Sequence, residues 1–211
     1  MNPLPALLVL TDRAAAAARG RTLAETVAAA VSAGARAVVF REKDLAPADR
    51  RSLGAEVAAV MPPDGRLLVA SDSHLAAELD AAGVHLAAAD PLPEPAPATV
   101  GRSCHDRMEV RAAAAQGVDY VTVSPVYPTP SKPGYGPALG REALRDLAAT
   151  ADAPPVYALG GVDAARIPDC IAAGAAGVAV MGAVMASEDP GAAVAALVAA
   201  LGTTSGVEEL R

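Results

Sequence analysis

The segment AGARAVVFRE at residues 33–42 contains the pattern that decides the fold. An Ala-rich stretch with helical spacing ends at Gly34, and a short β-branched run follows it directly. Glycine just after a helix adopts the left-handed conformation at no steric cost. The next residues are apolar on both faces, which is typical of a parallel strand buried from both sides. The pattern recurs in AGVHLAAAD (82–90), QGVDYVTVSP (116–125) and AGAAGVAVMG (173–182).

The rest of the chain continues this alternation of strand and helix. Strands are expected near residues 6–11, 37–41, 67–70, 84–86, 99–102, 119–124, 155–159 and 177–181. Helices are expected near residues 22–33, 47–60, 74–82, 105–116, 141–150, 164–173 and 190–201. This order predicts an α/β fold, a single-domain (β/α)8 TIM barrel over residues 1–211, with residues 202–211 as a frayed polar tail. The alternative, a doubly wound open sheet, usually carries GxGxxG after its first strand, and this chain has none there.

The composition excludes several classes of function. The chain has 17 basic and 24 acidic residues, a net charge of −7 and 2% aromatic residues, which argues against a nucleic-acid partner. No apolar run reaches the roughly 18 residues of a membrane span, and the N-terminus lacks the basic region of a signal peptide. We therefore expect a cytoplasmic protein without a membrane partner. Cys104 and Cys170 have no metal-binding spacing, so we expect reduced thiols that serve packing.

The loop after the second predicted strand reads Arg41-Glu42-Lys43-Asp44. In a TIM barrel the chemistry lies on such loops. Arg41 and Lys43 are two residues apart, so they point the same way if the strand continues. Two neighbouring cations repel each other unless an anion lies between them, which indicates an anion site. The alternative is a solvated edge on which Glu42 and Asp44 pair with the two cations.

Two carboxylates follow the third and fourth predicted strands, Asp72 in Ser71-Asp72-Ser73 and Asp90. Carboxylates on adjacent loops can share Mg²⁺, which takes few protein ligands and completes its shell with phosphate and water. Alternatively, Ser73 caps a helix and Asp90 only begins the proline-rich loop PLPEPAPA.

The three histidines differ in their expected roles. His105 follows the fifth predicted strand, where a ring with a pKa near ~6.5 could move protons. Alternatively, it is a residue of the first helical turn without a role. His85 lies inside the fourth predicted strand, where we expect a hydrogen-bonded core residue, and His74 is expected at the exposed start of a helix.

The longest loop, residues 124–136, follows the sixth predicted strand and combines proline-rich stretches with Gly-Tyr-Gly. This composition indicates a flap that closes over ligand, and a linker is a poor alternative. Thr129, Ser131 and Lys132 offer two hydroxyl groups and an ammonium group for a phosphate. After the last two strands, Gly160-Gly161 and Gly182 match the phosphate site that TIM barrels often build there from backbone N–H groups.

These segments resemble the thiamine phosphate synthase/TenI family over about residues 6–200. The matching segments are LLVLTD (7–12), FREKD (40–44), SD (71–72), GVHLAAAD (83–90), GRSCH (101–105), SPVYPTPSKP (124–133), ALGG (158–161) and GVAVMGAV (177–184). The resemblance implies a (β/α)8 barrel that couples a hydroxymethylpyrimidine diphosphate to a thiazole phosphate and releases diphosphate with Mg²⁺.

The resemblance also implies roles for individual residues. The diphosphate substrate would contact Arg41, Lys43, Ser103 and Lys132, of which Lys132 is also expected to act in catalysis. The Mg²⁺ ligands would be Asp72 and Asp90. The thiazole phosphate would be held by Thr129, Ser131, Gly161 and Gly182, and Ser71 is expected among the substrate-binding residues. Ala-rich helix faces on the outside of a barrel permit a homodimer.

The chain departs from the synthase pattern at four positions. Val39 and Ala88 replace glutamines, Ser71 replaces an asparagine and Gly182 replaces a serine. These departures favour a TenI-type thiazole tautomerase, in which His105 would transfer the proton. The retained Asp72, Asp90 and TPSK favour the synthase, since a tautomerase releases no diphosphate. A third hypothesis is a barrel that only binds a thiamine precursor.

Overall fold

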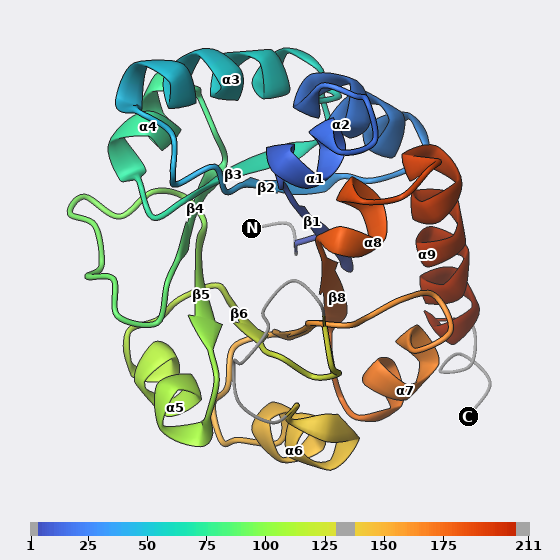
Figure 1. Cartoon of the computed structure of the whole chain (residues 1–211). Coiled ribbons are helices and arrows are strands. Elements are labelled where there is room, and N and C mark those ends of the chain that lie inside the picture. The colour runs from blue at the N-terminus through green and yellow to red at the C-terminus, as the bar shows by residue number, and fades with distance from the viewer. Residues whose placement is uncertain (1–3, 130–137, 206–211) are drawn as a thin grey trace.

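Eight parallel strands form a closed barrel in the computed structural model, which describes residues 4–129 and 138–205 (Figure 1). The strands are β1 Leu7–Leu10, β2 Ala37–Phe40, β3 Arg66–Ala70, β4 Gly83–Leu86, β5 Val100–Cys104, β6 Tyr120–Val123, β7 Val156–Leu159 and β8 Gly177–Val180. Each strand pairs with the next, and Leu7 pairs with Val178 to close the barrel between β1 and β8. The predicted TIM barrel is confirmed, and the open sheet is excluded.

The described helices surround the strands in Figure 1. They are α1 Arg13–Ala17, α2 Leu23–Ser32, α3 Pro47–Ala59, α4 Ser73–Glu78, α5 Arg107–Ala115, α6 Gly140–Ala148, α7 Ile167–Ala172, α8 Gly182–Met185 and α9 Pro190–Ser205. All seven predicted helices are present, whereas α1 and α8 were not predicted. Because α9 extends to Ser205, the first part of the expected tail is helical, and residues 206–211 lie outside the described residues. Within the described ranges, no helix has the length and apolar character to cross a membrane.

The core has two shells, because successive residues of a strand point to opposite faces. In β1, Leu8 and Leu10 point into the barrel, while Leu7 and Val9 pack between the strands and the helices. The buried residues of the inner shell are Leu8, Leu10, Ala37, Val39, Leu68, Ala70, Tyr120, Tyr157 and Ala179. Strands that are buried on both faces explain the apolar runs of the sequence.

Two tyrosines fill the barrel interior. The rings of Tyr120 and Tyr157 meet edge to face with their centroids 5.5 Å apart. Each ring takes the space that a side chain would need on a neighbouring strand. A Cβ atom at Gly101 would lie 2.1 Å from Cζ of Tyr120, and one at Gly177 would lie 2.6 Å from Cε1 of Tyr157. Glycine is therefore required at both positions.

The connection between β4 and β5, residues 87–99, contains no helix. It forms the long loop on the left of Figure 1. Prolines at positions 91, 93, 95 and 97 have no backbone N–H group, which explains why no helix forms here. One βα unit of the barrel therefore lacks its outer helix.

Candidate active site

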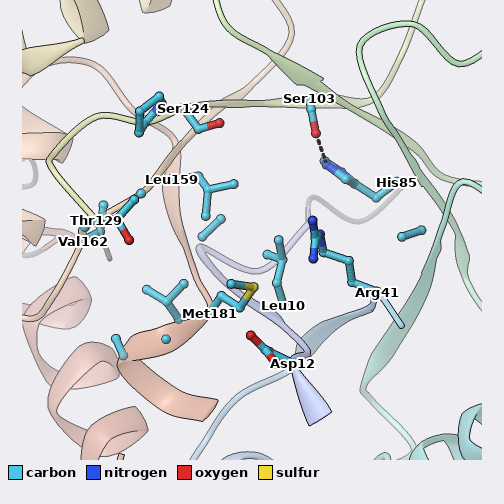
Figure 2. A pocket seen from close by; sticks show the side chains of 18 of the residues that line it. Leu10, Asp12, Arg41, His85, Ser103, Ser124, Thr129, Leu159, Val162 and Met181 are labelled. Atoms are coloured by element: carbon cyan, nitrogen blue, oxygen red, sulfur yellow. Dashed lines mark hydrogen bonds between the residues drawn. The ribbon is translucent and has the colours of Figure 1, made fainter. Parts of the chain in front are cut away.

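The C-terminal ends of the strands surround a cavity of about 860 Å³. The structure brings seven of the expected site residues into its lining, namely Arg41, Lys43, Ser103, His105, Thr129, Gly161 and Gly182. Figure 2 shows Arg41 and Ser103 on one side of the cavity and Thr129 on the other. A second, smaller cavity of about 300 Å³ adjoins the first, because both are lined by Lys43.

The two cations after β2 face the cavity because their acidic neighbours are bound elsewhere. Glu42 is buried, and its Oε1 accepts a hydrogen bond from Thr11 Oγ1 at 2.6 Å. Arg13 binds Glu42 Oε2 at 3.1 Å and forms two bonds of 2.7 Å to Asp44. The Arg13 bonds also hold the pKa of Asp44 below its ordinary value. The alternative in which Glu42 and Asp44 pair with Arg41 and Lys43 is therefore wrong.

Thr11 also fixes the backbone at the first of these cations. Its Oγ1 accepts a hydrogen bond from the Arg41 N–H group at 2.9 Å, in addition to donating to Glu42. Strand β2 ends at Phe40, so it is this side chain, and not a continued strand, that holds Arg41.

The second cation connects to one of the expected metal ligands. Lys43 Nζ donates to Ser71 Oγ at 2.6 Å, and Ser71 Oγ donates to Asp90 Oδ2. Asp90 Oδ2 also accepts the Ala87 N–H group at 2.7 Å. Burial would raise the pKa of Asp90, but these hydrogen bonds and the charge of Lys43 outweigh it and hold the pKa below its ordinary value. Asp90 is therefore ionised at neutral pH.

The other expected metal ligand is held at the start of a helix. Asp72 Oδ1 accepts the Leu75 N–H group at 2.9 Å and caps α4, so the expected cap at Ser73 is wrong by one residue. Asp72 Oδ2 forms a salt bridge of 2.8 Å with Arg50, whose side chain is largely buried. Neither Ser71, Asp72 nor Asp90 belongs to the lining of the larger cavity.

The described residues offer few protein ligands for a metal ion. No three His, Cys, Asp or Glu side chains of the described residues form a metal-ligand group. Mg²⁺ usually binds one or two carboxylates and takes its other ligands from phosphate and water. Asp72 and Asp90 follow the neighbouring strands β3 and β4, and in this structure Asp72 Oδ2 is paired with Arg50.

A buried histidine supports the hydroxyl group at the floor of the cavity. His85 Nε2 lies 3.0 Å from Ser103 Oγ, and its Nδ1 lies 2.9 Å from the Tyr120 hydroxyl oxygen (Figure 2 shows the Ser103 contact). Burial, together with the charges of Lys43 and Arg41, lowers the pKa of His85 to about 3. The ring is therefore neutral, and the expected hydrogen-bonded core residue is confirmed.

Backbone and glycine residues form the opposite side of the cavity. Gly160 and Gly161 have φ of 94° and 63°, in the left-handed region. A Cβ atom at Gly161 would lie 2.5 Å from the Pro128 carbonyl oxygen, so the loops after β6 and β7 are in close contact. Arg166 Nη1 binds the Gly161 carbonyl, and its guanidinium lies 4.8 Å from the centre of the Tyr127 ring.

Comparison with known proteins places the chain in a family. A model of the thiamine monophosphate synthase family matches residues 7–184. The chain belongs to this family. A thiamine-phosphate synthase from a Roseiflexus species is 36% identical over 196 residues, which cover 90% of this chain and 82% of the relative. One from Methanoculleus marisnigri is 37% identical over 198 residues, which cover 90% and 92%.

A solved structure has a similar fold. The thiamine phosphate pyrophosphorylase from Pyrococcus furiosus matches with a TM-score of 0.83 at 28% identity, over 94% of this chain and 96% of that protein. The family resemblance seen in the sequence is thereby confirmed.

His105, the proton carrier of the tautomerase hypothesis, lies at the edge of the same cavity. Its Nδ1 lies 2.7 Å from the Ser124 carbonyl oxygen, so Nδ1 carries a proton and donates. Its backbone N–H group binds Glu109 Oε2 at 2.6 Å. The adjacent Cys104 is buried, which raises the pKa of its thiol to about 12 and leaves it a packing role.

The departures from the synthase pattern lie at three kinds of place. Ala88 and Gly182 line the cavity, Val39 is buried in the inner shell, and Ser71 binds Lys43. Ser131 and Lys132 lie outside the described residues, together with most of the segment expected to form a flap.

Several residues of the site were not predicted from the sequence. Asp12, Asp163 and Arg166 line the cavity, and Arg13 and Arg50 bind the acidic residues around it. Asp12 lies in the LLVLTD segment of the family resemblance, and its position before an Ala run is a helix-cap signal that could have revealed α1. The two arginines have no such signal, because their partners are distant in the sequence.

Proposed function

We propose that this chain is a thiamine phosphate synthase, a transferase that joins hydroxymethylpyrimidine diphosphate to thiazole phosphate. One observation carries this proposal beyond family membership. Arg41, Lys43 and the Ser103 hydroxyl lie in the lining of the same cavity as the glycine loops after β7 and β8. Such a cavity suits one substrate with a diphosphate and a second with a monophosphate.

The first chemical step is the departure of diphosphate. Arg41 and Lys43 bind this group and stabilise the negative charge that grows on it as the C–O bond to the pyrimidine methylene carbon breaks. The electron pair of that bond leaves with the diphosphate. The thiazole nitrogen then forms the new C–N bond at the same carbon. No side chain has to remove a proton, so the protein acts by positioning and charge stabilisation.

In this proposal, Asp72 and Asp90 hold Mg²⁺. When it is bound, the metal supplies additional positive charge next to the diphosphate. Asp90 is already ionised and is held by Ser71 and Ala87. On the opposite side, Thr129, Gly161 and Gly182 bind the thiazole phosphate, together with Ser131 of the family motif, whereas Lys132 of the same motif binds the diphosphate.

The test is an assay with both substrates, in which thiamine phosphate and diphosphate are measured with Mg²⁺ and with EDTA. We expect both products with Mg²⁺ and their loss in EDTA. The D90N variant should lose most of the activity, because its amide is a poorer Mg²⁺ ligand than a carboxylate. A wild-type enzyme that forms product equally well in EDTA would contradict the proposed mechanism. Binding of the precursors without turnover would instead support the binding-only barrel.

A thiazole tautomerase is the second candidate, and it rests on one observation. His105 lines the cavity and its Nδ1 donates to the Ser124 carbonyl oxygen, so Nε2 is the nitrogen that would accept the proton. Isomerisation of a thiazole carboxylate phosphate should then proceed in EDTA and be lost in H105A. Full activity of H105A would eliminate this candidate.

A cytoplasmic location and a homodimer are further parts of the proposal. The location rests on the lack of a long apolar run in the sequence, and the homodimer rests on the Ala-rich helix faces. Analytical ultracentrifugation measures the second directly, and a sedimentation mass of 20.9 kDa, that of one chain, would contradict it.

A further inference from the structure

Arg102 lies on β5 at a position where the barrel ordinarily packs an apolar side chain. Its register partners are Leu86 on β4 and Val121 on β6, and both belong to the outer shell of the core. Arg102 is nevertheless only 3% exposed. A guanidinium group therefore occupies the outer face of the barrel beside the one connection that lacks a helix.

The guanidinium group binds the turn that begins this connection. Arg102 Nη1 lies 3.0 Å from the Ala87 carbonyl oxygen, 2.9 Å from that of Ala88 and 2.8 Å from that of Asp90. The turn has one backbone bond of its own, from the Asp90 N–H group to the Ala87 carbonyl oxygen at 3.1 Å. The four prolines that follow supply no N–H group. The turn is thus held mainly by a side chain from the next strand.

The same turn carries a carboxylate on its other side. The carbonyl groups face Arg102, whereas Asp90 Oδ2 accepts hydrogen bonds from the Ala87 N–H group and from Ser71. Ser71 in turn binds Lys43, which lines the cavity. A continuous set of hydrogen bonds therefore connects Arg102 to the cation that faces the substrate.

Burying Arg102 lowers the stability of the protein, so the stability of the barrel does not explain why an arginine is found here. Its Nε and Nη2 atoms are buried and have no hydrogen-bond partner among the described residues. Burying donors without partners lowers stability. An apolar side chain would suit this face, as Leu86 and Val121 show. The gain that offsets the cost is the fixed turn.

We propose that Arg102 is a positioning residue, which holds the turn after β4 so that the Asp90 carboxylate, the proposed Mg²⁺ ligand, keeps its place against Ser71 and the Ala87 N–H group. This inference rests on the proposed function. Partners of ligating groups that do not touch the metal themselves typically change metal affinity or activity by about 10- to 100-fold when they are replaced.

Three variants test the inference. R102M keeps the length of the side chain and removes all its donors, and R102K returns an ammonium group with three donors. The control is R36M, because Arg36 Nη1 also binds two carbonyl oxygens, those of Val31 and Ala35. Arg36 precedes β2 and therefore lies at the opposite end of the barrel from the cavity.

The first measurement does not depend on activity. Hydrogen–deuterium exchange should become at least about tenfold faster at the amides of Ala87 and Asp90 in R102M, because the closed turn protects them. R102K should be intermediate, and R36M should match the wild type in this segment. Calorimetry with inorganic diphosphate at fixed Mg²⁺ should show the weakest binding in R102M, intermediate binding in R102K and wild-type binding in R36M.

The second measurement separates positioning from a general loss of structure. In R102M, the Mg²⁺ concentration for half-maximal activity should rise about 10- to 100-fold, while the KM for thiazole phosphate stays unchanged. Unchanged exchange at residues 87–90 in R102M would overturn the inference. Equal rises in the KM for the diphosphate substrate and the KM for thiazole phosphate would also overturn it. If R102M does not fold, R102K decides by the same criteria.

Failure of the inference can be told apart from failure of the proposed function. A wild-type protein without synthase activity would disprove the function, and the exchange and calorimetry measurements would still decide the role of Arg102. An active wild type with normal exchange in R102M would disprove only the inference.

Discussion

The two sides of the cavity are built by different means. The loop after β2 presents Arg41 and Lys43 to the cavity, and Lys43 is fixed by a hydrogen bond to Ser71, which in turn binds Asp90. The loops after β7 and β8 present Gly160, Gly161 and Gly182, the first two at positive φ, and Asp163 and Arg166 also line the cavity on this side. We refer to the two sides as the charged side and the glycine side.

The difference shows how each side obtains its rigidity. On the charged side, Arg41 and Lys43 can face the cavity because Glu42 and Asp44, their acidic neighbours, bind Arg13 instead. On the glycine side, the chain itself is shaped by close contact, as between Gly161 and Pro128. Substitutions on the two sides should therefore affect different substrates.

Loss of Arg41 should have the largest effect. R41Q removes a charge at the departing diphosphate, and removal of one such stabilising group typically lowers kcat by about 10²–10³-fold. The KM for thiazole phosphate should stay near the wild-type value. Steady-state kinetics with each substrate varied in turn measure both, and R36Q is the control cation at the far end of the barrel. Equal changes in both substrate constants would break the distinction between the two sides.

Thr11→Val should weaken the charged side indirectly. It removes the hydroxyl that binds the Arg41 N–H group and Glu42, which leaves buried polar groups without a partner. The free energy of unfolding should fall by about 1–3 kcal/mol, and the KM for the diphosphate substrate should rise. T11S should restore both, as urea titration and kinetics can establish. A stable T11V with normal kinetics would show that Thr11 does not hold Arg41.

His85 should make the charged side sensitive to acid. The unfolded ring titrates near ~6.5, whereas burial lowers the pKa in the folded protein to about 3. Below the unfolded value, only the unfolded state takes up this proton, so stability falls as the pH falls toward the folded value. From pH 7 to pH 5 the loss from this group is about 2 kcal/mol.

H85Q should flatten this dependence, as denaturant titrations at pH 7 and pH 5 would measure. H74Q is the control, because His74 is 84% exposed. Equal losses of stability in the wild type and in H85Q would contradict the assignment of a neutral, buried ring.

Gly161→Ala should have the smallest effect and should act on the glycine side. An alanine at this positive φ costs about 1–2 kcal/mol, and its Cβ would press on the Pro128 carbonyl oxygen. We expect a higher KM for thiazole phosphate with the diphosphate substrate unaffected. The control is G117A, which has a similar φ of 68° and no atom within 4 Å of the added Cβ. A change in diphosphate affinity would contradict the division into two sides.

The barrel was predictable from sequence because its signals are local. A glycine after a helix and a buried apolar run identify four of the strands within about ten residues each, as at Gly34 and Gly174, and the other strands follow from apolar runs between helices. The helices α1 and α8 were missed because one helical turn, such as Arg13–Ala17, is too short to show a period.

Some members of the site were predictable, but their hydrogen-bond partners were not. Arg41, Lys43 and Ser103 were expected at the site because they follow predicted strands and match the family segments, and all three line the cavity. Pairing is a different problem, since Arg13 and Glu42 are 29 residues apart and no spacing rule relates them. The cap at Asp72 was placed at Ser73 because both residue types are favoured at that position.

The tyrosines inside the barrel have a consequence for the order of events. Tyr120 and Tyr157 block the axis beneath the cavity, so molecules reach His85 and Ser103 only through the mouth. Because the cavity has one opening, the substrate that binds deepest must bind first, and the product that lies deepest must leave last. Kinetics should then be sequential and ordered, with the release of the innermost product delayed until the outer one has gone.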